Sequence, residues 1–267
     1  MKNNSRQSFL GKRSDPILKD VRVGIIGLGG SGSHVIQQLA HIGVEHFFLC
    51  DPQSIEDTNL NRLVGATQED VDEKRKKAVI AERTIKNINP RASCVRLERK
   101  WQEEAKQLRQ CDVIFGCVDS FSARNELERY ARRYLMPYFD MGMDVHGGDG
   151  TSDRFFITGQ AVRSTPDGPC LRCVGVLRDG DIDREERNYG TAGNRPQVVW
   201  PNGVLASTAV GLFVEMFTPW HDLPCTTVCM DYDGNSHTIK PRAGGSLDQN
   251  ECTHYRPDEV GDPFFKD

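Results

Sequence analysis

A glycine-rich turn near the start of the chain constrains the fold more than any other part of the sequence. Residues 21–27 have the apolar composition of a buried strand, and residues 33–43 have apolar positions at helical spacing. Between them lie four glycines that form one candidate phosphate-binding turn: Gly27, Gly29, Gly30 and Gly32. Glycines allow a tight turn and a close approach to phosphate oxygens, which then face the N–H groups that begin the helix. The segment therefore predicts a nucleotide-binding βαβ unit.

An acidic residue follows at the position where such units bind a ribose. Asp51 ends the next apolar strand, residues 46–51, and lies 19 residues after Gly32. Its carboxylate can accept hydrogen bonds from ribose hydroxyls. The alternative is that the glycines only permit a close contact between helix and strand. Turn and acid together favour nucleotide binding, but they do not distinguish a nicotinamide cofactor from ATP.

Strand and helix patterns alternate over residues 21–150, which predicts an α/β fold with a Rossmann-like, mostly parallel sheet and helices on both faces. Residues 112–119 are almost continuously apolar, as parallel strands covered on both faces usually are. A helix is expected over residues 69–87, ending before Pro90. Residues 1–20 precede this nucleotide-binding half as a polar N-terminal arm.

The second half, residues 151–267, has a different character, and we expect it to add an antiparallel extension within one integrated domain. Residues 150–163 are expected to form an antiparallel hairpin, and residues 226–242 a strand pair about a turn. A long polar segment, residues 178–203, lies between them; such crossover loops are usually functional or disordered. Residues 204–217 predict a buried helix.

Net charge and hydropathy exclude several classes of partner. The 267 residues carry a formal net charge of -4, so no basic field favours nucleic acid or an anionic membrane. The N-terminus is polar, and the most apolar run, residues 203–217, is interrupted by Ser, Thr and Glu, so we expect neither signal peptide nor membrane span. A cytoplasmic location follows, where nine cysteines suggest metal binding, catalysis or burial rather than disulfides.

Two cations and a carboxylate after the ribose-binding acid favour phosphate chemistry over hydride transfer. Arg62 and Lys77 follow Asp51 closely, and Asp119 ends another predicted strand. Charge that grows on transferring phosphate oxygens must be neutralised, whereas the pyrophosphate of a nicotinamide cofactor takes no part in the reaction. Each residue alone also fits a simpler interpretation: the cations as solvated surface charges, and Asp119 as the cap of the next helix.

From Arg6 to Arg242 the sequence resembles the ThiF/MoeB/HesA family, bacterial relatives of the adenylation domain of ubiquitin-activating enzymes. The resemblance rests on five motifs in a fixed order: "GLGGSGS", "EDTNLNR" after the acid, a lysine before "INP", "CVDSFSAR" and "GPCLRC". It implies an ATP-dependent adenylyltransferase, in which the C-terminal glycine carboxylate of a ubiquitin-like or sulfur-carrier protein attacks the α-phosphate of MgATP.

The resemblance also assigns roles to individual residues. Asp51 would hold the ribose, Asn59 would help to orient the triphosphate, and Arg62 and Lys77 would face phosphate oxygens. Asp119 would hold Mg²⁺.

The N-terminal "SRQ" resembles an arm that reaches the nucleotide of a partner subunit. Arg6 would then act in trans, which requires a homodimer; Lys12 or Arg13 in the same arm could serve instead.

The pair Cys170 and Cys173 is half of a tetrahedral zinc site. The resembling family has a second Cys-x-x-Cys after the final strand, but this chain has one cysteine there, so Cys252 and His254 are the candidates that complete the site. Cys225 and Cys229 are a competing pair, although Cys229 falls in a predicted strand. The alternative is a turn with two thiols that bind no metal.

Some resembling proteins also carry a nucleophilic cysteine in the crossover segment, but residues 174–203 contain none. Adenylation without a covalent enzyme intermediate is therefore expected, with Cys117 as a minor candidate nucleophile. Two rivals stay open: an ATP-dependent dehydratase of a modified tRNA base, and a nicotinamide-dependent oxidoreductase. The sequence does not name the carrier, nor whether a conjugating enzyme or a sulfurtransferase receives the acyl group.

Overall fold

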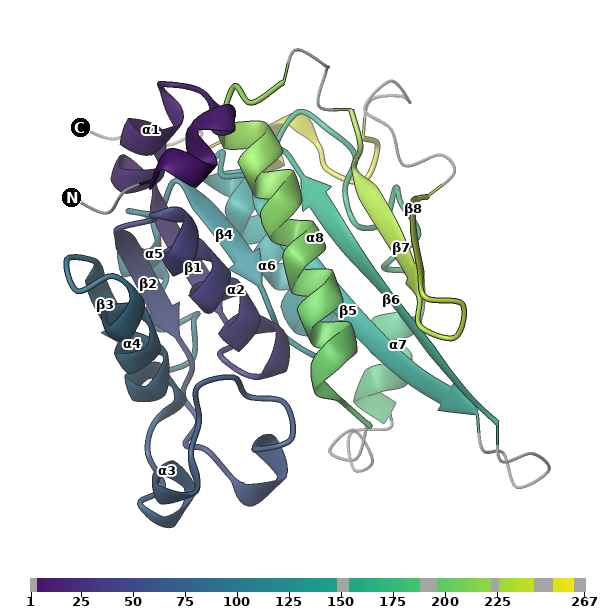
Figure 1. Ribbon diagram of the computed structural model, residues 1–267. Helices are drawn as coiled ribbons and strands as arrows, with labels where there is room; N and C mark the ends of the chain where they lie inside the picture. The colour runs from purple at the N-terminus through teal and green to yellow at the C-terminus, as the bar shows by residue number, and fades with distance from the viewer. Residues whose placement is uncertain (1–3, 148–153, 188–195, 222–225, 243–251, 262–267) are drawn as a thin grey trace.

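A single mixed sheet of eight strands organises the chain. The computed structural model describes residues 4–147, 154–187, 196–221, 226–242 and 252–261. The strand order is β3-β2-β1-β4-β5-β6-β7-β8 (Figure 1). The strands are β1 (Arg22–Ile26), β2 (His46–Cys50), β3 (Ser93–Leu97), β4 (Val113–Gly116), β5 (Tyr138–Gly147), β6 (Phe155–Ser164), β7 (Cys229–Asp233) and β8 (Thr238–Pro241). The first five are parallel and the last three antiparallel, as expected.

Helices cover both faces of this sheet, which confirms the predicted architecture (Figure 1). One face carries α2 (Gly30–Ile42), α4 (Lys77–Ile88) and α8 (Val199–Phe217); the other carries α5 (Ala105–Leu108) and α6 (Phe121–Arg133). Separate apolar clusters lie on the two faces, and β4 is buried throughout its length. Strands buried on both sides need apolar residues at every position, which explains the unbroken run in that segment.

Short elements connect the sheet and the main helices. They are η1 (Asn4–Leu10), α1 (Ser14–Asp20), η2 (Asp57–Asn59), α3 (Gln68–Asp72), α7 (Asp181–Arg187) and η4 (Pro257–Glu259). The N-terminal arm is therefore folded rather than extended, and α7 lies in the segment expected to be irregular. In the described part of the chain, no helix is both long and apolar enough to span a membrane.

Two local predictions were wrong, each for a physical reason. The helix expected over residues 69–87 is split into α3 and α4, because Lys74 takes a left-handed conformation with φ of 50°. Residues 155–164 form one strand that pairs with β5, instead of folding back on themselves as a hairpin. The expected pair about residues 233–238 is confirmed as β7 and β8, and α8 begins at Val199, five residues before the predicted start at residue 204.

Candidate functional site

A cleft of about 890 Å³ opens at the carboxyl ends of the parallel strands, where β1 has β2 on one side and β4 on the other. Strand order reverses at this point, and open α/β sheets bind ligands there. The cleft brings together most of the residues singled out in the sequence. Its lining includes Gly27, Gly29, Gly30, Asp51, Asn59, Arg62, Lys77 and Asp119.

The glycines of the turn meet different constraints. Gly27 has a φ of 90°, and a Cβ there would lie 2.3 Å from the carbonyl oxygen of Cys117. Gly32 packs beneath the turn, since its Cβ would lie 2.0 Å from the Gly27 carbonyl oxygen. Gly29 faces open space, with no atom within 4 Å of a Cβ. Two glycines are therefore required by the fold, whereas Gly29 leaves room for a ligand beside the N-terminus of α2.

Asp51 is almost fully buried, and two backbone N–H groups hold its carboxylate in place. Its Oδ2 accepts a hydrogen bond from the backbone N–H of Leu28 at 2.8 Å, and its Oδ1 accepts one from the N–H of Gln53 at 2.8 Å. Each carboxylate oxygen retains a lone pair for a further donor. The acid is thus fixed at the carboxyl end of β2 with acceptor capacity toward the cleft.

Lys77 is the lysine of its cluster that lines the cleft. Its ammonium donates to Oε1 of Gln53 at 2.7 Å, and 7% of the residue is exposed. Lys76 instead donates to the carbonyl oxygen of Pro52 at 2.7 Å. The start of α4 therefore turns one lysine toward the cleft. In the sequence, only the spacing of Lys77 to "INP" distinguished it from the neighbouring lysines.

Arg62 and Asn59 come from the loop that follows β2. The Arg62 guanidinium donates to the Thr58 carbonyl oxygen at 2.6 Å and to Oδ1 of Asn61 at 2.9 Å. Asn59 accepts from the N–H of Glu56 at 3.2 Å, so its carboxamide caps η2 while it borders the cleft. Arg62 adds a second positive charge beside that of Lys77.

Asp119 is exposed at the end of β4, and it is not the cap of the next helix. Ser120 caps α6, because its Oγ accepts the N–H of Ala123 at 3.1 Å. The Asp119 carboxylate instead accepts from Nε2 of Gln197 at 3.2 Å. An exposed carboxylate with free oxygen lone pairs suits Mg²⁺, which prefers oxygen ligands.

Arg6 lies far from the cleft of its own chain. It is exposed on η1, and the neighbouring Gln7 donates to the carbonyl oxygen of His41 at the last turn of α2. The glycine turn lies at the other end of this 13-residue helix, about 20 Å away at 1.5 Å per residue. Phe9 of the same arm packs edge-on against Trp220 beyond α8.

Sequence reasoning missed Gln53 and Gln197, which line the cleft, and Asn202, which contacts the lining residue Ser31. Asn202 accepts from the Ser31 hydroxyl at 2.6 Å and donates to the Val198 carbonyl oxygen at 2.9 Å, which ties α8 to the start of α2. No spacing rule identifies such residues, because each acts through a contact with a distant part of the chain.

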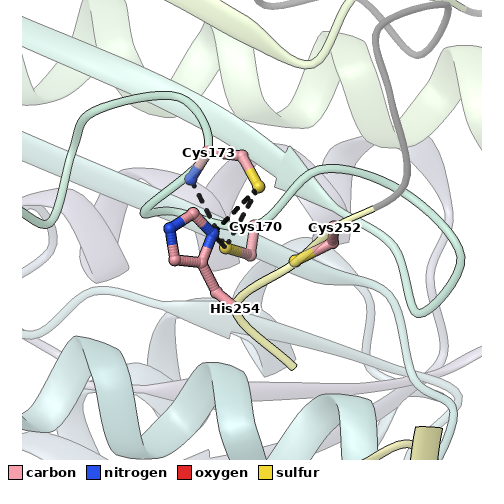
Figure 2. Close-up of side chains that lie close together, drawn as sticks. All are labelled: Cys170, Cys173, Cys252 and His254. Atoms are coloured by element: carbon pink, nitrogen blue, oxygen red, sulfur yellow. Dashed lines mark hydrogen bonds between the residues drawn. The ribbon is translucent and has the colours of Figure 1, made fainter. Parts of the chain in front are cut away.

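A second site lies beside α6, where four potential ligands converge (Figure 2). The ligand atoms of Cys170, Cys173, Cys252 and His254 all lie within 4.8 Å of one another. The competing cysteine pair does not take part: Cys229 is buried in β7, and Cys225 lies outside the described residues.

The geometry of this group fits a tetrahedral metal ion. The Cys170 and Cys173 sulfurs are 3.5 Å apart, and Nδ1 of His254 lies 3.5 Å from the first and 3.3 Å from the second. Ligands about 2.3 Å from a tetrahedral centre are roughly 3.8 Å apart, so small adjustments would admit zinc. The Cys₃His set could therefore hold a metal with the residues that the sequence indicated.

Helix α6 connects this group to the cleft. Glu128 is fully buried, and its carboxylate accepts from the N–H of Leu171 at 2.9 Å and from the Tyr255 hydroxyl at 3.1 Å. Arg132, one turn further, lies 4.8 Å from the centre of the Tyr255 ring. The helix thus holds both the Cys170 loop and the C-terminal segment that supplies the other two ligands.

Cys117 lies close to the glycine turn but is poorly suited to nucleophilic attack. Burial and the nearby carboxylates of Asp140 and Asp119 raise the pKa of its thiol well above the ordinary value. A thiol must lose its proton to become nucleophilic.

Comparison with known proteins agrees with this geometry. The family model described as "ThiF family" matches residues 2–253. The Escherichia coli sulfur carrier protein ThiS adenylyltransferase is 29% identical over 211 residues, 77% of each chain. The SAMP-activating enzyme E1 of Haloferax volcanii is 31% identical, over 57% of this chain and 53% of its own length. The chain thus spans about half the length of that relative.

Solved structures show the same fold. Escherichia coli MccB with MccA-N7isoASN superposes with a TM-score of 0.74 at 20% identity, over 91% of this chain and 72% of MccB. The MccB structure with ATP gives a TM-score of 0.70. The expectation of an adenylyltransferase agrees with the names of the sequence relatives, and the match over nearly all residues settles membership: the chain belongs to the ThiF family.

Proposed function

We propose that this chain is an ATP-dependent adenylyltransferase that activates the C-terminal carboxylate of a ubiquitin-like or sulfur-carrier protein. One observation carries the proposal: a single cleft gathers Asp51, Arg62, Lys77 and Asp119 around the glycine turn. A site that binds a nucleoside triphosphate with its metal ion needs these groups: an acceptor for the ribose hydroxyls, two cations for the phosphates and a carboxylate for the metal. A hydride-transfer reaction would leave the cations and Asp119 without a role.

The chemistry follows from the charges in the cleft. A carboxylate oxygen of the carrier attacks the α-phosphorus of ATP, an O–P bond forms, and the bond to the bridging oxygen breaks, so that pyrophosphate leaves. Arg62 and Lys77 stabilise the charge that develops on the phosphate oxygens. When bound, a magnesium ion held by Asp119 supplies further charge neutralisation. No protein nucleophile is needed, because the carrier carboxylate attacks phosphorus directly. The crossover segment has no cysteine, and the pKa of the half-buried Cys117 thiol is raised.

The substrate class rests on the names of relatives, which include activators of a sulfur carrier and of SAMP. A tRNA threonylcarbamoyladenosine dehydratase of Haemophilus influenzae is also 28% identical over 60% of this chain, so that activity is the second candidate. The net charge of -4 disfavours tRNA. Free cysteines in the described residues fit the reducing cytoplasm.

Exchange of labelled pyrophosphate into ATP tests the proposal directly. Exchange should require a carrier protein that ends in glycine, and Lys77→Ala should slow it by roughly 100-fold or more. Lys76→Ala is the matched control, since that neighbour bonds a backbone carbonyl instead of lining the cleft. Turnover with tRNA alone would favour the dehydratase. Normal exchange by Lys77→Ala would contradict the proposed role of this lysine.

The position of Arg6 supports a homodimer in which each arm completes the partner's site. The arm folds against the end of α2 opposite the cleft, so Arg6 could reach a nucleotide only on another copy. Mixing Arg6→Ala and Lys77→Ala chains should then restore exchange, because one of the two sites in a mixed dimer has both residues. No recovery in the mixture would refute action in trans.

A further inference from the structure

Asp119 is the candidate metal ligand of the cleft, and its orientation depends on one neighbour. In the part of the chain that the structure describes, the side-chain hydrogen bond to this carboxylate comes from Nε2 of Gln197, at 3.2 Å to Oδ1. The two residues are 78 positions apart in the sequence, and both line the cleft. Oδ2 is left for another partner.

Gln197 is itself held by the loop that follows β2. Its carbonyl oxygen accepts from Nδ2 of Asn61 at 3.2 Å, and Oδ1 of the same Asn61 accepts from the Arg62 guanidinium at 2.9 Å. One glutamine therefore connects the carboxylate at the end of β4 with the cation of the loop after β2. Its side chain contacts the carboxylate, and its backbone reaches the cation through Asn61.

The backbone beside Gln197 is also fixed. Asn202, which is almost fully buried, donates to the carbonyl oxygen of Val198 at 2.9 Å and accepts from Ser31 at 2.6 Å. Gly30 must lack a side chain for this contact, since a Cβ there would lie 2.6 Å from Nδ2 of Asn202. The glycine turn, α8 and Gln197 thus form one connected unit. Such outer contacts orient metal ligands, and their loss commonly weakens metal binding by about 10- to 100-fold.

We propose that Gln197 is a positioning residue, which holds the Asp119 carboxylate with one oxygen engaged and the other directed to the magnesium ion of the bound nucleotide. This inference rests on the proposed function of the cleft. An amide donor suits the task, because it stabilises the carboxylate without a charge that would compete with the metal. It predicts that Gln197 acts on the metal dependence of nucleotide binding rather than on nucleotide binding itself.

Calorimetric titration with ATP tests this without any turnover. The quantity to compare is the ratio of the ATP Kd in EDTA to the ATP Kd in Mg²⁺, which reports how much the metal strengthens binding. Gln197→Ala and the similarly long Gln197→Met should reduce this ratio by about 10-fold and leave the Kd in EDTA unchanged. Asp119→Asn should reduce it at least as much.

Gln38→Ala is the matched control. Gln38 of α2 donates a side-chain hydrogen bond to Ser207 of α8 at 3.1 Å, and neither residue lines the cleft. The Kd ratio of Gln38→Ala should therefore equal that of the wild type. A normal ratio in both Gln197 variants, with a reduced ratio in Asp119→Asn, would overturn the inference alone. A normal ratio in Asp119→Asn would overturn it together with the metal role of Asp119, and absence of ATP binding by the wild type would refute the proposed function.

Discussion

At the scale of single residues, two glycines of one turn differ in what they do. Gly27 has a positive φ, and any side chain there would meet the Cys117 carbonyl oxygen, whereas Gly29 has a negative φ of −83° with ψ of −143° and open space beside it. The first glycine is needed to fold the turn, because a side chain there overlaps the backbone. At the second, a side chain would meet no protein atom within 4 Å but would enter the space that a ligand would occupy.

Gly29→Ala should therefore lower the melting temperature less than Gly27→Ala does, yet weaken ATP binding roughly 10-fold, about 1.4 kcal/mol, because the new methyl group competes with the phosphates for space. Gly27→Ala should lower the free energy of unfolding by about 3 kcal/mol through backbone strain and steric overlap. Thermal unfolding and ATP titration of both variants check this. Equal ATP affinity in Gly29→Ala and the wild type would argue against phosphates beside this turn.

Residues that act through the local chain could be predicted, and residues that act across the fold could not. Asp51 and Lys77 stand at fixed distances from a recognisable turn or motif, and the structure places both in the cleft. Gln53 and Gln197 have no such spacing. The sequence could not identify them, because their partners come close only in the folded chain. These partners are the ammonium of Lys77 for Gln53 and the carboxylate of Asp119 for Gln197.

At the scale of elements, a buried carboxylate joins the short helix α3 to α4. Asp70 is fully buried; it accepts from Arg75 at 2.7 Å and from Arg83 at 2.6 Å, and it forms a capping box with Thr67. The hydrogen bonds from the Arg83 guanidinium are the main cause of a pKa for Asp70 well below its ordinary value. Arg83 also donates to the carbonyl oxygen of Gly65 at 2.8 Å, which connects this cluster to the loop that carries Arg62.

Asp70→Asn should lower the free energy of unfolding by about 2 to 3 kcal/mol at pH 7. A depressed folded-state pKa stabilises the protein above the unfolded value of 3.8, and this contribution is lost as the pH falls below it. The difference between wild type and variant should therefore shrink on acidification. Urea unfolding at pH 7, 4 and 3 measures it, and a difference that stays constant would exclude a charged Asp70 as its source.

Element boundaries show where sequence patterns lose information. The sheet and its two helical layers follow from apolar periodicity, which long buried elements express clearly. The break between α3 and α4 depends on the left-handed Lys74, and no residue type marked it, because lysine rarely takes that conformation. The pairing of β6 with β5 was missed for a similar reason. Strand pairing depends on which strand lies alongside, and the residues of one segment do not determine its partner.

At the scale of the whole molecule, the Cys₃His group ties the end of the described chain to the body of the domain. Two of its ligands come from the loop after β6 and two from residues 252–254, and α6 contacts both through Glu128. Structural zinc sites commonly supply part of the folding free energy. The C-terminal segment should therefore be held in place by the metal.

Purified protein should contain one zinc ion per chain by elemental analysis. Removal by a strong chelator should lower the melting temperature and increase amide hydrogen exchange in residues 252–261. Cys252→Ser should lose the metal, while Cys94→Ser, a half-buried cysteine outside the group, should retain it. Full metal content in Cys252→Ser would remove this residue from the proposed ligand set.

The central claim is that the cleft at the strand-order reversal binds MgATP with its α-phosphate open to a carboxylate. A crystal structure with MgATP tests it most directly. We predict the ribose on Asp51, the triphosphate beside Gly29 and facing Arg62 and Lys77, and the magnesium ion on Asp119. Nucleotide bound elsewhere, or side chains of Arg62, Lys77 and Asp119 turned away from the phosphates, would contradict the account.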